Sequence, residues 1–67
     1  MIQNEAQLRQ ALQQIQNLYS ALDGLRVEVF PKNPRNFAIL AEGPLEQIRQ
    51  LQLQMDEYVH FLEETPA

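Results

Sequence analysis

The chain is organised around residues 8–29, which read LRQALQQIQNLYSALDGLRVEV. Apolar side chains recur there every three or four residues, at Leu8, Leu12, Ile15, Leu18, Tyr19, Leu22, Leu25 and Val29. At about 100° per residue these positions stay on one side of a helix. Asn4 is a suitable N-cap ahead of the stripe, and Gln7 follows three residues later, as in a capping box. We therefore expect a long amphipathic helix over residues 5–29.

The end of this helix has two interpretations. Asp23-Gly24 is a turn signal, but Leu25 and Val29 continue the stripe beyond it, and Pro31 is the first residue that forces an end. Residues 26–30 (RVEVF) also alternate as a strand does, and they can pair with residues 37–41 across a turn at 31–36. The helical interpretation leads. The alternative is an α+β fold with a β-hairpin at residues 26–41 between the helices.

The second half of the sequence predicts two further helices. Asn33 is a fitting N-cap for a short connecting helix, with Pro34 at its first position and Gly43 just past its end. Gly43-Pro44 then opens a last helix over residues 45–64, whose stripe runs through Leu45, Ile48, Leu51, Met55, Tyr58, Val59 and Leu62. We expect an all-α fold: an antiparallel helical hairpin of two long helices with a short connecting helix, in a single domain spanning residues 1–67.

Composition excludes several classes of function. The chain has 67 residues, no cysteine, and nine acidic against five basic side chains, for a formal net charge of −4. Without cysteine there are no disulfides and no thiolate zinc sites. The acidic balance argues against a nucleic-acid partner, which would require phosphate neutralisation. The longest apolar run is only residues 37–41, so we expect no membrane partner, and without a visible secretory leader we expect a cytoplasmic protein.

Catalytic motifs are almost absent. The chain has two glycines, too few for a phosphate-cradling loop, and nothing places its one serine, Ser20, beside its one histidine. We therefore expect no enzyme activity and no cofactor. Three basic residues, Arg26, Lys32 and Arg35, lie around the predicted connector. We interpret them as charges exposed to water, and the more specific alternative is that they contact a nucleic acid.

One pattern resembles a metal site. Glu57 and His60 have the Glu-x-x-His spacing of di-iron helical bundles, and Glu64 follows one turn later. On a helical wheel all three fall opposite Ile48 and therefore point away from the hairpin seam. An acidic, solvated helix end is the leading interpretation. A metal-binding or small enzymatic bundle, assembled across a dimer around Glu57, His60 and Glu64, is the alternative function.

Two large apolar residues also fall outside the stripe. Leu53 and Phe61 would stay in water in an isolated hairpin, which indicates a second buried surface. We expect an interface there, together with Tyr58, and a homodimer with a four-helix arrangement. The chain is therefore interpreted as a non-enzymatic helical protein-interaction module that self-associates.

The sequence also resembles the helical region that precedes the DNA-binding domain of some helix-turn-helix antitoxins. The resemblance is carried by MIQNE at residues 1–5 with Gln7-Leu8, and by residues 46–51 (EQIRQL) through Asp56-Glu57-Tyr58. Residues 31–33 and 41–43 are similar to a small uncharacterised family of bacterial helical proteins. Only nine residues follow Tyr58, so no helix-turn-helix follows in this sequence. The resemblance implies a dimerising or toxin-contacting piece, with a toxin-like or regulatory protein as partner and no catalytic residues.

Overall fold

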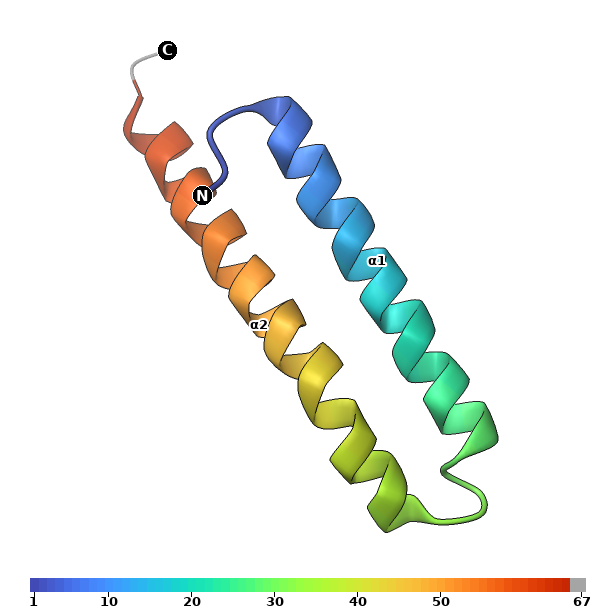
Figure 1. Ribbon diagram of the computed structural model, residues 1–67. Coiled ribbons are helices and arrows are strands. Elements are labelled where there is room, and N and C mark those ends of the chain that lie inside the picture. The colour runs from blue at the N-terminus through green and yellow to red at the C-terminus, as the bar shows by residue number, and fades with distance from the viewer. Residues whose placement is uncertain (66–67) are drawn as a thin grey trace.

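The computed structural model describes residues 1–65, which form two antiparallel helices joined by a short connector (Figure 1). Helix α1 spans Glu5–Glu28 and helix α2 spans Pro34–Glu64. No strand occurs in residues 1–65. The all-helical class and the packing of the two helices against each other are thus confirmed, and the alternative of a β-hairpin at residues 26–41 is wrong.

Side-chain caps start both helices where the sequence predicts them. The Asn4 side chain accepts a hydrogen bond from the backbone N–H of Gln7 at 2.9 Å. The Gln7 side chain in turn accepts from the backbone N–H of Gln3 at 2.7 Å, one residue earlier than in a standard capping box. At α2, the Asn33 side chain accepts from the backbone N–H of Asn36 at 3.1 Å, and Pro34 occupies the first turn. These bonds satisfy donors that the first helical turn leaves without partners.

Helix α2 does not stop at Gly43, contrary to the prediction of a short connecting helix followed by a separate last helix. It continues through Gly43 and Pro44 as one helix of 31 residues. Neither glycine of the chain has a positive φ, so Gly43 does not act as a helix-ending residue. The reason lies in the burial on either side. Ala41 and Ile48, seven residues apart, are both buried, and one uninterrupted helix keeps both on the side facing α1.

The two helices meet along regular stripes with alternating steps of three and four residues. On α1 and the residue that caps it, the partly or fully buried apolar residues are Leu8, Ala11, Ile15, Leu18, Leu22, Leu25 and Val29. On α2 the matching apolar residues are Phe37, Ala41, Pro44, Ile48, Leu51, Met55 and Tyr58. This is the heptad pattern of helices that pack side by side. Leu12, which the sequence places in the stripe, instead lies beside it, and the smaller Ala11 is buried.

The connector is held by local contacts. The Phe30 and Phe37 rings meet edge to face, with their centroids 5.4 Å apart. The backbone N–H groups of Lys32 and Asn33 both donate to the Val29 carbonyl, at 3.0 and 2.9 Å. The chain therefore reverses direction within a few residues and brings α2 back alongside α1.

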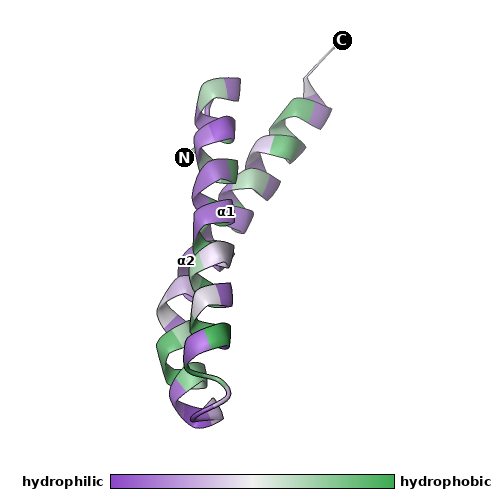
Figure 2. Ribbon diagram, turned by 90° about the vertical axis from the view of Figure 1, so that its right-hand side faces the viewer, coloured by the Kyte–Doolittle hydropathy of each residue, from purple (hydrophilic) through white to green (hydrophobic). Residues whose placement is uncertain are grey.

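The resulting molecule is a thin rod with a very small core. It measures 53 × 17 × 15 Å, and its radius of gyration of 15.3 Å exceeds the roughly 11 Å typical of a compact domain of this length. Buried apolar residues number only five among the described residues: Ile2, Ala11, Ile15, Ala41 and Ile48. Figure 2 shows that the last turns of α2 diverge from α1. The large apolar side chains of these turns, Val59, Phe61 and Leu62, are exposed.

Continuity of α2 gives a clear prediction for Gly43→Ala. A Cβ added at Gly43 meets nothing within 4 Å, and a mid-helix alanine is about 1 kcal/mol more favourable than glycine. We expect this substitution to raise the free energy of unfolding by about 0.5–1 kcal/mol in urea titrations followed by circular dichroism. Gly24→Ala, in the middle of α1 with equally open space, is the matched control and should have a similar effect. A destabilised Gly43→Ala beside a stabilised Gly24→Ala would mean that α2 breaks at Gly43.

Candidate functional site

The residues of the candidate metal site lie exposed on the last turns of α2. Glu57, His60 and Glu64 are all exposed, in agreement with their predicted outward orientation. His60 lies nearest to a different carboxylate, with 3.8 Å between its Nδ1 and Oε2 of Glu63. Within residues 1–65, no three His, Asp or Glu side chains come close enough together to hold a metal ion. The structure therefore does not bring the predicted trio together as a ligand set.

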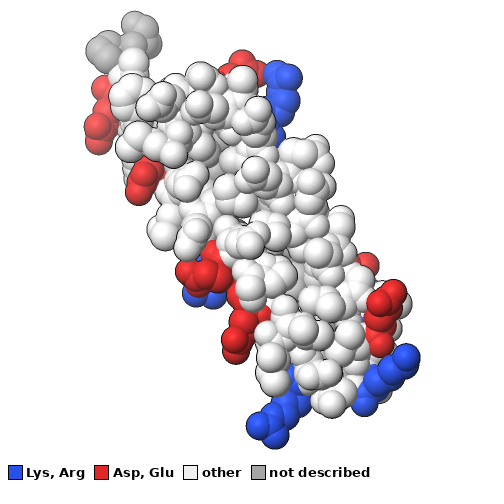
Figure 3. Space-filling model, viewed as in Figure 1, with Lys and Arg blue, Asp and Glu red and all other residues white. Residues whose placement is uncertain are grey.

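The predicted basic cluster lies at the connector end of the rod. Arg26 forms an ion pair with Asp23: the Nε and Nη2 atoms of Arg26 each lie 2.9 Å from Oδ1 of Asp23. Lys32 and Arg35 are exposed, and Figure 3 shows basic side chains at this end of the molecule. The cluster is therefore a set of solvated charges, one of them paired within its own helix.

Charge is distributed unevenly along the rod. Residues 10–55 contain four basic and four acidic side chains and are neutral overall. The whole net charge of −4 therefore lies at the opposite end from the connector, in residues 5–9 and 56–64. These two segments are neighbours because α1 starts where α2 ends (Figure 1).

The residues expected at an interface lie on α2 but do not share one surface. Leu53 is 59% exposed and Phe61 is 62% exposed, so both stand in water as the sequence predicts. They are eight residues apart, which separates them by about 80° around the helix. Tyr58 is half-buried and faces the N-terminal segment. No single partner surface therefore covers all three residues equally.

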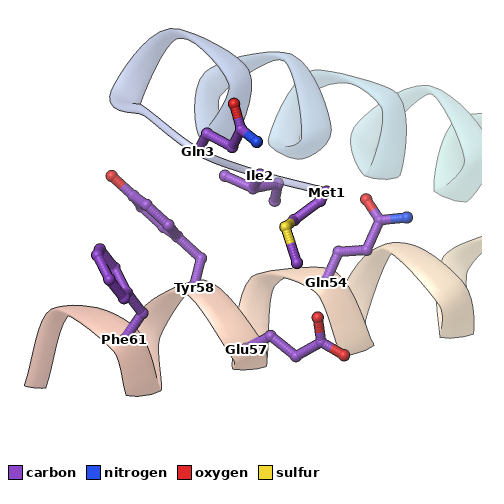
Figure 4. Close-up of a pocket in the computed structure, with 7 residues that line it drawn as sticks. All are labelled: Met1, Ile2, Gln3, Gln54, Glu57, Tyr58 and Phe61. Atoms are coloured by element: carbon purple, nitrogen blue, oxygen red, sulfur yellow. The ribbon is translucent and has the colours of Figure 1, made fainter. Parts of the chain in front are cut away.

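Residues 1–3 form a strap that closes the diverging end of the hairpin. Ile2 is only 8% exposed, although it lies outside both helices. The strap leaves a cavity of about 220 Å³ against α2, lined by Met1, Ile2, Gln3, Gln54, Glu57, Tyr58 and Phe61 (Figure 4). The helical periodicity that identifies the other core residues does not reach Ile2. The signal that could have found it is an apolar residue shortly before an N-cap, as in a hydrophobic staple.

The two sides of the helix seam differ in chemistry. One side, the glutamine flank, consists of Gln7 and Gln14 on α1 and of Gln47 and Gln54 on α2. It carries two shallow grooves, one lined by Gln14, Asn17, Leu18, Gln47 and Leu51 and the other reaching the strap. Figure 3, which views the molecule from this flank, shows uncharged side chains across its middle.

The opposite side, the apolar flank, consists of Leu12 and Tyr19 on α1 and of Leu45 and Val59 on α2. Relative to Ile15 and Ile48 in the seam, these residues are rotated by about 20–60° in one direction, whereas the glutamines are rotated in the other. All four are between 43% and 51% exposed. The helical periodicity of the sequence places all four in the seam, and only the structure separates them as a face of their own.

In comparisons with known proteins, no family model, no curated protein and no solved structure matches the chain. Within residues 1–65, neither helix has a stretch long and apolar enough to cross a membrane. The same residues include no buried polar or charged side chain. The described surface carries exposed apolar side chains and paired surface charges.

The strap makes Ile2 a stability determinant. Ile2→Ala should lower the free energy of unfolding by about 2 kcal/mol or more, because a buried isoleucine is truncated. Met1 is 85% exposed, so Met1→Ala is the control and should change the free energy by less than about 0.5 kcal/mol. Thermal and urea unfolding followed by circular dichroism measure both. Equal, small effects would show that the strap is not docked.

The metal alternative is tested by thermal unfolding with added Zn²⁺. A ligand that binds only the folded chain raises the melting temperature by mass action. Because the trio is not brought together, we expect no shift at concentrations near about 1 mM, and the same melting temperature for His60→Ala. A rise in the parent chain that His60→Ala abolishes would establish a metal site.

Proposed function

We propose that this chain is a non-enzymatic helical protein-interaction module that self-associates, most simply as a homodimer with a four-helix arrangement. The observation that carries this proposal is the apolar surface that the hairpin leaves in water. Twelve large apolar side chains are exposed in the described residues, against five buried apolar residues, of which two are alanines. This excess of exposed over buried apolar side chains supports a contact with a further chain.

The total surface area supports the same proposal. The chain exposes 5398 Å², whereas a monomeric protein of 7.8 kDa exposes about 4,400 Å². The excess of about 1,000 Å² is comparable with the roughly 800 Å² that each partner buries in a standard protein–protein interface. Association with one further subunit of similar size would therefore bring the exposed area per chain to an ordinary value.

Stability is a second reason for a partner. A hairpin of two helices buries one seam, and small single cores rarely contribute more than a few kcal/mol. Burying a side chain as large as leucine or phenylalanine contributes roughly 1.5–3 kcal/mol. The exposed surface that could supply this contribution includes Leu53 and Phe61, which the sequence places at an interface with Tyr58, and also Leu12 and Tyr19. Symmetric dimers are the commonest solution for such chains.

The biological class of the module is proposed from the sequence. The resemblance to the helical region of helix-turn-helix antitoxins favours an antitoxin-like protein or a regulatory adaptor, with a toxin-like or regulatory protein as a further partner. A non-enzymatic role is supported by the composition, since one histidine, one serine and two glycines provide few catalytic groups. A partner other than nucleic acid is supported by the net charge of −4.

Sedimentation equilibrium tests the proposal directly. At micromolar concentration the chain should have about twice the mass of 7.8 kDa. Its melting temperature should also rise with protein concentration, because association stabilises the folded state by mass action. A folded monomer with a concentration-independent melting temperature, up to about 1 mM, would contradict self-association.

A further inference from the structure

Helix α1 carries a second regular strip of residues, all of them exposed, beside the seam on the side of the apolar flank. Its centre is formed by Leu12, Gln16 and Tyr19, with Glu5 and Arg9 toward one end and Asp23 and Arg26 toward the other. The steps between successive members alternate between four and three residues, so all seven lie along one line of the helix surface. This strip contains all the charged side chains of α1 except Glu28.

The strip is complementary to itself when its direction is reversed about Gln16. Glu5 and Arg26 lie at nearly equal distances from Gln16 along the helix, as do Arg9 and Asp23, and Leu12 and Tyr19. Each charged residue is thus matched with one of opposite sign, and each large apolar residue with another. A surface of this kind fits a copy of itself across a two-fold axis, because residue i then meets residue j and j meets i.

The charges of the strip already form ion pairs within α1. Nη2 of Arg9 lies 3.6 Å from Oε1 of Glu5, and Nη2 of Arg26 lies 2.9 Å from Oδ1 of Asp23, each pair within one face of the helix. All four side chains are more than half exposed. In the reversed copy, the acidic member of one pair meets the basic member of the other, so that two ion pairs become a network of four charges.

We propose that self-association takes place by antiparallel packing of α1 on α1 of a second copy, with the two-fold axis at Gln16. This inference rests on the proposed self-association and adds to it the face, the direction and the register. Leu12 would pack on Tyr19 of the second copy, and Glu5 and Arg9 would pair with Arg26 and Asp23 of the second copy. Leu45 and Val59 of the apolar flank extend the same interface onto α2.

Charge favours the antiparallel direction over the parallel one. A parallel pairing would place together two ends that each carry the full net charge of −4. The antiparallel pairing places that acidic end beside the connector end, which holds Arg26, Lys32 and Arg35. On α2 the same register sets Arg35 opposite Glu63 of the second copy but also sets Glu42 opposite Asp56, so α1 carries most of the complementarity.

A charge-exchanged chain tests the register without relying on loss of folding. The variant Glu5→Arg, Arg9→Glu, Asp23→Arg, Arg26→Glu keeps an opposite-sign pair at each end of α1 and keeps the strip complementary to its own copy. It should form homodimers, but against the parent strip it brings like charges together at all four charged positions. We expect ¹⁵N-labelled parent chain mixed with this variant to give, by native mass spectrometry, less than about a tenth of the heterodimer that random mixing produces.

Two further variants separate the apolar flank from the predicted α2 surface. Leu12→Gln with Tyr19→Gln should raise the dimer dissociation constant by about a hundred-fold or more, because four large side chains leave each interface. Leu53→Gln with Phe61→Gln replaces the α2 residues that the sequence places at an interface. If α1 carries the dimer, this second variant should raise the constant far less than the first one does. Circular dichroism verifies helical content for each variant.

Each outcome supports or overturns the inference. Heterodimers at the random proportion, or dissociation caused by the Leu53 and Phe61 pair and not by the Leu12 and Tyr19 pair, would overturn the α1 interface while leaving self-association intact. A parent chain that is monomeric would overturn both this inference and the proposed function. If the charge-exchanged chain does not fold, the dissociation constants of the two glutamine variants decide whether the interface lies on α1.

Discussion

Two helices can bury only the stripes by which they face each other, and this constraint underlies the rest of the structure. In this chain the stripes are narrow, and two of the residues buried in them are the alanines Ala11 and Ala41. Each helix therefore keeps large apolar side chains on its other sides. The rod-like shape, the small core and the exposed surface are three results of the same limit on what a hairpin can enclose.

The constraint also explains why local signals are overruled at one position. Proline within a helix costs about 3 kcal/mol, and glycine adds about 1 kcal/mol. Helix α2 nevertheless continues through Gly43-Pro44, and the half-buried Pro44 itself occupies a seam position. A break there would turn Ala41 or Ile48 away from α1. Because only five residues are buried, the exposure of either one would remove a large part of the core. Packing with the partner helix thus outweighs the local preference.

The sequence predicts the parts of the fold that depend on local chemistry. The caps at Asn4 and Asn33, the helical state of residues 26–28 and the hairpin all follow from side-chain type and spacing. Three features do not follow from local chemistry, because they depend on how the segments pack against one another. These are the unbroken α2, the choice of Ala11 over Leu12 for the seam, and the burial of Ile2 by a segment with no periodicity.

The same division holds for the candidate site. The outward position of Glu57, His60 and Glu64 and the exposure of Leu53 and Phe61 follow from a helical wheel of α2 alone. The apolar flank does not, since a wheel of one helix cannot tell which edge of a broad stripe the neighbouring helix covers. Leu12 and Tyr19 are separated from the seam only when the position of α2 is known.

The strap at residues 1–3 has a consequence for the order of folding. Contacts around the connector join residues such as Phe30 and Phe37, which are close in sequence, so the hairpin can close from that end at little entropic cost. The strap instead meets Tyr58, almost the full length of the chain away. We therefore expect it to be the last element to gain its contacts as the chain folds and the first to lose them when the chain opens. Until the strap docks, the apolar surface around Tyr58 and Phe61 is uncovered and can contact other molecules in solution.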